Sequence, residues 1–73
     1  MEFTVVMGKK HEGGGISTVE IIKDSNHCLG RCRGIGNYVV RRPDRKHYRM
    51  RSFIDEYTFY KSSGYKVVRI DVN

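Results

Sequence analysis

Apolar residues in this chain fall in short β-branched runs separated by glycine-rich connections, and this spacing favours strands over long helices. A chain of 73 residues has room for one hydrophobic core, so we expect residues 1–73 to form a single compact basic domain. The longest apolar runs, residues 4–7 and 20–22, are too short to cross a bilayer. We therefore expect a folded domain that does not enter a membrane.

The segment patterns predict five strands and one helix. The strands are expected at residues 3–7, 16–23, 37–42, 47–51 and 65–72, and the helix at residues 52–63. The fold class predicted from this order is α+β, with a small antiparallel or mixed sheet in the order β-β-β-β-α-β and one helix packed on one face. The opposite face of the sheet is expected to be open for binding.

The helix has the clearest local signals in the chain. Ser52 can cap its start, with Asp55 completing an approximate capping box, and Gly64 can end it. An apolar stripe at helical spacing is expected to pack on the sheet, and it consists of Phe53, Ile54, Tyr57 and Tyr60.

Two strands show a period of two, which separates their side chains between two faces. In one, Tyr48 and Met50 alternate with His47, Arg49 and Arg51, so a packed face and a cationic face are expected. In the last strand, the apolar face is expected to hold Val68, Ile70 and Val72, and the other face Arg69 and Asp71.

The net charge of +6 is concentrated in the middle of the chain. Residues 31–51 hold eight basic residues and one acid, Asp44, whereas the rest of the chain holds six basic and seven acidic residues. The guanidinium group can grip phosphate with two parallel hydrogen bonds and can stack on bases. The candidate residues for binding nucleic acid or a partner are Arg31, Arg33, Arg41, Arg42, Arg45, Lys46, Arg49 and Arg51. The alternative is that these charges only keep a small protein soluble.

A glycine-rich segment at residues 8–15 is expected to be a flexible loop, in which Lys9 and Lys10 contact a partner. The segment lacks the Gly-Lys-Ser/Thr ending of a phosphate-binding P-loop. A second loop is expected at residues 24–36, where Arg31 and Arg33 lie beside glycines that let the backbone approach a phosphate. Tyr38, Tyr48 and Tyr65 could stack on bases if they face outward.

Few residues in the chain suggest metal or catalytic chemistry. His27, Cys28 and Cys32 are residue types that bind zinc, but they form one group where structural sites use two separated pairs, so free thiols are the alternative. No motif frames a nucleophile or an acid–base pair. We expect no cofactor and no enzymatic activity.

Small size, clustered arginines at residues 31–51 and the glycine segment at residues 8–15 give the chain a resemblance to a family of phage proteins. It resembles the small lytic-bacteriophage regulators of host RNA polymerase, of the antitermination and sigma-displacing type. The resemblance rests on features of the whole chain and assigns no residue by alignment. It implies docking on a polymerase subunit by pairing of a sheet edge with an extended segment, and a basic face near the RNA exit path. Arg41, Arg42, Arg45, Arg49 and Arg51 would then face RNA.

The function expected from these observations is transcription regulation, through docking on bacterial RNA polymerase and presentation of a basic face to RNA or DNA. Such a protein would inhibit initiation, termination or both, in the cytoplasm, and in the host bacterial cytoplasm if a phage encodes it. One alternative is an autonomous RNA- or DNA-binding module, whose affinity would fall steeply with salt. Another is an inhibitor of some other acidic host protein.

Overall fold

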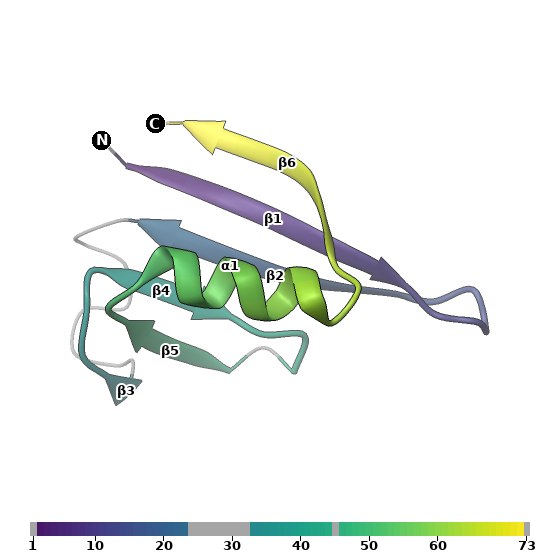
Figure 1. The fold of residues 1–73 in the computed structure, drawn as a ribbon, viewed down its shortest axis with the longest axis horizontal. Helices are drawn as coiled ribbons and strands as arrows, with labels where there is room; N and C mark the ends of the chain where they lie inside the picture. The colour runs from purple at the N-terminus through teal and green to yellow at the C-terminus, as the bar shows by residue number, and fades with distance from the viewer. Residues whose placement is uncertain (1, 24–32, 45, 73) are drawn as a thin grey trace.

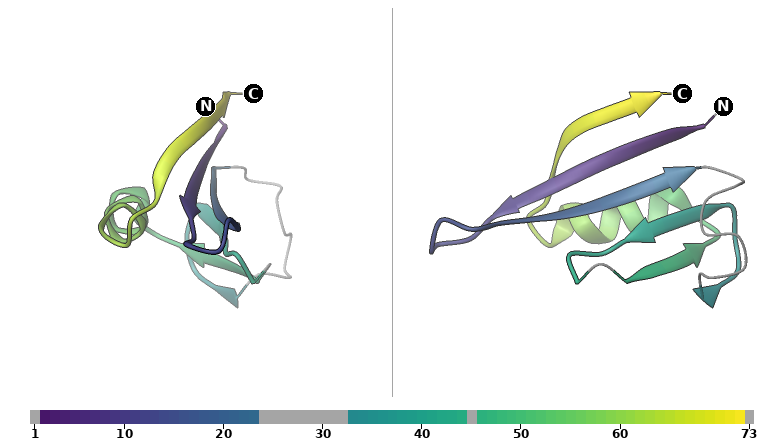
Figure 2. Two further views of the ribbon diagram at one scale, coloured as in Figure 1. Left: turned by 90° about the vertical axis from the view of Figure 1, so that its right-hand side faces the viewer. Right: turned by 180° about the vertical axis from the view of Figure 1, so that it is seen from behind.

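A computed structural model of the chain describes residues 2–23, 33–44 and 46–72. The described chain folds into one six-stranded sheet with the strand order β3-β5-β4-β2-β1-β6, and a single helix, α1, lies against one face of it (Figure 1). The fold is thus α+β, as predicted from the sequence. We call the face that carries α1 the helix face and the other the back face (Figure 2).

The sheet is mixed, because five strands are connected by antiparallel pairing and one by parallel pairing. β1 pairs with β2 and β6, and β4 pairs with β2 and β5, all antiparallel, whereas β3 pairs with β5 in parallel. The elements are β1 (Phe3–Lys10), β2 (Ile16–Lys23), β3 (Arg33–Gly34), β4 (Tyr38–Arg41), β5 (His47–Met50), α1 (Phe53–Ser62) and β6 (Lys66–Val72). The two-residue strand β3 is an addition to the predicted order, which placed an irregular loop there.

The hydrophobic core lies between α1 and the strands at the middle of the sheet. Each of these strands contributes β-branched or other apolar side chains at alternate positions, as a half-buried strand requires. The buried cluster consists of Val5, Met7, Val19, Ile21, Val40 and Tyr60. Aromatic rings extend this core at one end, where the Phe3 and Phe53 ring centroids are 5.7 Å apart in an edge-to-face arrangement.

Helix α1 begins and ends where the sequence predicts. The hydroxyl of Ser52 accepts a hydrogen bond from the Asp55 amide at 3.3 Å, which caps the first turn. At the other end the amide of Gly64 donates to Lys61 and that of Tyr65 to Tyr60, a pattern that Gly64 permits because its φ is +94°. These caps fix the length of the helix at ten residues.

One member of the predicted apolar stripe does not pack on the sheet. Phe53 and Tyr57 pack against the core and Tyr60 is buried within it, but Ile54 is 63% exposed. Residues 53, 57 and 60 follow the helical repeat, and residue 54 is rotated by about 100° from residue 53. The prediction that Ile54 packs on the sheet is therefore wrong, because Ile54 lies about 100° around the helix from Phe53.

The first hairpin is longer than predicted. β1 continues through Gly8, Lys9 and Lys10, and these residues pair with residues 16–18 of β2. The connection is therefore confined to residues 11–15, and the prediction of a flexible loop at residues 8–15 is wrong for its first three residues. Glycine weakens a strand interior by only about 0.5–1 kcal/mol, so cross-strand hydrogen bonds carry the strand past Gly8.

A β-bulge in β6 changes which of its side chains share a face. The pairing with β1 shifts by one residue between Val6 and Met7, so that Met7 lies opposite Val67. Val67 therefore joins Ile70 and Val72 on the helix face, and Val68 contacts the position of Gly8 instead. The predicted face of Val68, Ile70 and Val72 is wrong for Val68, because strict alternation cannot anticipate an inserted residue.

Part of the back face is buried. Val39 on β4 is fully buried there, and Val6 and Ile22 are nearly so. The expectation of an uncovered opposite face therefore fails at its centre. Among the residues that the structure describes, no helix is long and apolar enough to span a bilayer.

The approach to β5 depends on a glycine that we expect to be irreplaceable. Gly36 has φ of +144°, and a Cβ added there would collide with the carbonyl oxygen of Met50. Gly36→Ala should lower the free energy of unfolding by about 2 kcal/mol or more, measured by urea denaturation. Gly13→Ala is the matched control, since a Cβ at Gly13 would meet no atom within 4 Å and should leave stability nearly unchanged. Equal effects of the two substitutions would contradict the described geometry at β5.

Candidate nucleic-acid interface

Most of the predicted basic residues lie at one end of the sheet, on β3, β5, β4 and the segments that adjoin them (Figure 1). We call this group the basic edge, and it consists of Arg33, Arg41, Arg42, Lys46, Arg49 and Arg51. Strand order explains the grouping, because residues 33–51 fold into three neighbouring strands at the end of the sheet opposite β6. Arg31 and Arg45 lie outside the described residues.

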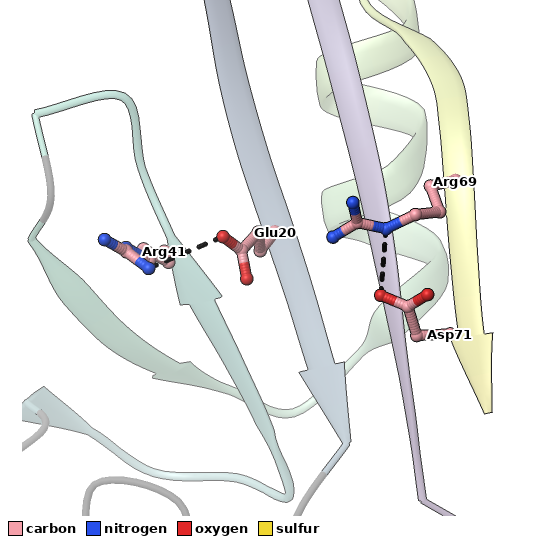
Figure 3. A network of polar contacts seen from close by, with 4 residues as sticks. All are labelled: Glu20, Arg41, Arg69 and Asp71. Carbon is pink, nitrogen blue, oxygen red and sulfur yellow. Dashed lines mark hydrogen bonds and ion pairs between the residues drawn. The ribbon is translucent and has the colours of Figure 1, made fainter. Parts of the chain in front are cut away.

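Arg41 projects from the back face of β4 and pairs with a carboxylate. Its guanidinium Nη1 lies 3.5 Å from Oε1 of Glu20 on the neighbouring strand (Figure 3). Both side chains keep substantial contact with solvent, so this ion pair contributes at most about 1 kcal/mol. The pair holds Arg41 in place and partly neutralises it.

Arg42 follows Arg41 in the chain and turns toward the helix face. Its guanidinium carbon lies 4.5 Å from the centroid of the Tyr48 ring, a cation–π distance. Burial raises the pKa of the Glu56 carboxyl on α1, and the charge of Arg42 opposes that rise. The backbone amide of Arg42 also donates to the Lys46 carbonyl across the Pro43–Asp44 turn at 3.1 Å. Arg42 therefore connects this turn to the helix.

Arg49 lies on the back face of β5, at the end of the sheet. It is opposite Val39 of β4 on one side and Gly34 of β3 on the other. Its Nη1 donates to the carbonyl of Gly36 at 3.4 Å, which holds the glycine-rich segment beside β5. Arg33 on β3 and Arg51 after β5 are both exposed. The basic residues are therefore gathered along one edge and not on one face.

A hollow of about 280 Å³ lies where β4 ends and β2 continues, paired there with β1 only. Its lining consists of Ile16, Ser17, Thr18, Glu20, Arg41, Arg42 and Pro43. Arg41 and Thr18 are lining residues that carry hydrogen-bond donors, and such donors suit a phosphate group. Arg42 also belongs to the lining, but its guanidinium stacks over the Tyr48 ring. Glu20 is the one carboxylate in the lining, and it opposes anion binding.

The other predicted contact residues are placed away from the basic edge. Lys9 packs along Gly64 at the end of the helix, with its Cε 3.4 Å from the position of a Cβ there. Lys10 is exposed at the end of β1, in the hairpin. The structure therefore does not bring these two lysines together with the arginines.

The tyrosines considered for base stacking take part in packing within the protein. Tyr38 contacts Phe3 and Phe53 in the aromatic end of the core, and Tyr65 lies edge-to-face with Tyr60 at 5.3 Å. Tyr48 is covered by Arg42 on one side of its ring. The weak zinc candidates His27, Cys28 and Cys32 lie outside the described residues.

Comparison with models of known protein families, with curated proteins and with solved structures finds no match to this chain.

Sequence reasoning missed the role of Glu20 and the hydroxyl groups beside it. Glu20 alternates with Val19 and Ile21, which shows that it faces away from the core. That it lies opposite Arg41 follows only from the register between β2 and β4. No signal in one strand alone identifies its partner in another.

Removal of the Glu20 carboxylate should strengthen binding of a polyanion. In Glu20→Gln the guanidinium of Arg41 loses its internal partner, so we expect heparin or single-stranded RNA to bind about three- to tenfold more tightly at low salt. Fluorescence anisotropy with a labelled oligonucleotide would measure the change. Glu12→Gln, in the exposed hairpin, alters net charge by the same amount and serves as the control. An equal gain in both variants would show that net charge alone is responsible.

Proposed function

We propose that this chain is a non-enzymatic transcription regulator that docks on bacterial RNA polymerase and presents its basic edge to nucleic acid. The single observation that carries the proposal is the gathering of six basic side chains at one end of the sheet, with one described acid, Asp44, in the same part of the chain. A one-sided positive surface attracts phosphate and orients the molecule as it approaches.

The geometry supports contact with the phosphate backbone more than reading of bases. Arg33, Lys46 and Arg51 are exposed at the edge, while Arg41 lies beside the hollow. Tyr38 and Tyr65 pack against other aromatic rings of the protein, so we assign base stacking a smaller role than phosphate contact. Phosphate contacts position a protein without selecting a sequence. We therefore propose that specificity comes from the polymerase and not from the nucleic acid.

The choice of polymerase as the machine is supported by the resemblance in size and charge to the small phage regulators described above. Action in the bacterial cytoplasm, on initiation, termination or both, belongs to the same proposal. An autonomous nucleic-acid module is the competing function, and the arginine-lined hollow favours it as well. A polymerase-docking regulator gains most of its affinity from the protein partner, whereas an autonomous module gains it from phosphate contacts.

A capture experiment separates these functions. Immobilised protein is incubated with nuclease-treated bacterial RNA polymerase at low and high salt. Docking on the enzyme predicts capture that persists at high salt, whereas an autonomous module loses its affinity steeply with salt and captures nothing after nuclease treatment. Absence of capture from nuclease-treated polymerase would contradict the proposed function.

Charge reversal then tests the basic edge within the complex. Arg33→Glu with Arg51→Glu should still capture polymerase but should lose most of its crosslinking to RNA in the complex, with a salt slope smaller by about one for each contact removed. Both residues are exposed, so the fold should tolerate the change. Lys61→Glu with Lys66→Glu is the matched control, since these exposed residues lie away from the basic edge. Equal loss in both pairs would contradict a localised interface.

A further inference from the structure

We propose that β6 is a dimer interface, at which a second copy of this chain adds its own β6 antiparallel to the first across a two-fold axis at Ile70. The two sheets would become one continuous sheet. This inference is independent of the proposed function, because it concerns the edge of the sheet opposite the basic edge.

The outer edge of β6 carries pairing capacity that the described chain does not use. β6 is the last strand in the sheet order, and it pairs with β1 on one side only. All seven of its residues are exposed, and α1 lies across the middle of the sheet and not over β6 (Figure 1). A long edge strand of this kind is a template for a further strand, whereas the bulge at Val68 and the charges of Lys66, Arg69 and Asp71 are features that oppose non-specific pairing. Pairing at this edge therefore requires a partner whose charges are complementary.

The apolar side chains of β6 argue for a covered edge. Val67, Ile70 and Val72 share the helix face and are 41%, 60% and 62% exposed. They continue the apolar surface of Phe3, Val5 and Met7 on the neighbouring strand. Since α1 does not cover this end, a neighbouring strand would remove part of that apolar surface from water.

The charges of β6 select a second copy as the partner and fix the register. Residues directly opposite in an antiparallel pair share a face, so a two-fold axis must pass through one residue. With the axis at Ile70, Arg69 of each copy lies opposite Asp71 of the other. An axis at Arg69 would place Arg69 opposite itself, and an axis at Asp71 would place Asp71 opposite itself. Only the central register converts the charges of Arg69 and Asp71 into attractive pairs. Regular pairing in this register is confined to residues 69–71, because the bulge places Val68 and the opposite Val72 on different faces.

The two side chains pair with each other within one strand, so the dimer requires each to exchange that partner for its counterpart in the second copy. Nε of Arg69 lies 3.0 Å from Oδ2 of Asp71 within the same strand, and both project from the back face (Figure 3). Their side chains are 67% and 49% exposed and lie on the β1 side of β6, so each must rotate toward the outer edge to meet the second copy. On the helix face, Ile70 would meet its own copy, with Val72 of the partner on the diagonal. The interface is self-complementary, as a two-fold interface requires.

Such a dimer places the two basic edges at opposite ends of the continuous sheet and both helices on the same side. The strand order of the joined sheet runs from one β3 to the other, with the two β6 strands at its centre. Each basic edge stays accessible. Dimerisation therefore neither blocks nor requires the contact proposed above.

A charge-exchange experiment tests both the partner and the register. Sedimentation equilibrium of the full chain, without nucleic acid or polymerase, should show a concentration-dependent dimer. Asp71→Arg alone and Arg69→Asp alone place like charges opposite each other, and each should weaken dimerisation by at least about tenfold. An equal mixture of the two variants should restore association, because their charges are then complementary across the interface. The double variant, Arg69→Asp with Asp71→Arg, should also dimerise like the unaltered chain.

Far-ultraviolet circular dichroism checks that each variant keeps its fold, which the exposure of both side chains favours. Lys66→Glu changes the charge of β6 outside the central register and should leave the dimerisation constant nearly unaltered. A chain that stays monomeric at all concentrations would overturn the proposal. A dimer that is insensitive to both single variants, or a mixture that fails to associate, would overturn it equally.

Discussion

The packing of one short helix on a much wider sheet determines the rest of this structure. A helix is about 10 Å across with its side chains, and strands are spaced by about 4.8 Å, so one helix covers about two strands. Here the sheet has six strands, and α1 covers those at its middle. The two ends of the sheet are therefore left without a helix, and they differ in character. One end is basic, and the other carries four apolar side chains together with Lys66 and the Arg69–Asp71 pair.

Local signals in the sequence were sufficient where one segment determines its own structure. The bounds of β2 and the caps at Ser52 and Gly64 follow from residue type and periodicity, and the structure confirms them. Local signals were insufficient where pairing with a neighbouring strand determines the length of a strand or the face of its side chains. Register carries β1 beyond Gly8, and the bulge in β6 moves Val68 to the other face. The parallel pairing of β3 joins residues that are separated by a turn and a strand, and no local pattern encodes it.

The same distinction applies to the candidate interface. The sequence shows that arginines are concentrated at residues 31–51, and strand order then gathers the described ones at one edge. The sequence alone could not show that Arg41 pairs with Glu20 or that Arg42 turns toward Tyr48 and α1. Arginines that are neighbours in the sequence therefore differ in role. Arg42 contributes to the fold, Arg41 is held beside the hollow, and Arg33 and Arg51 are exposed at the edge.

We propose that nucleic acid contacts the sheet at the basic edge. The most direct test is titration of the isotope-labelled chain with a short single-stranded RNA, followed by amide chemical shifts in nuclear magnetic resonance spectra. Binding at the basic edge should concentrate the shift changes at residues 33–51 and at the neighbouring residues 16–20, with β6 unchanged. Shifts that are spread evenly over α1 and β6, or an absence of shifts at residues 33–51 when RNA is bound, would contradict it.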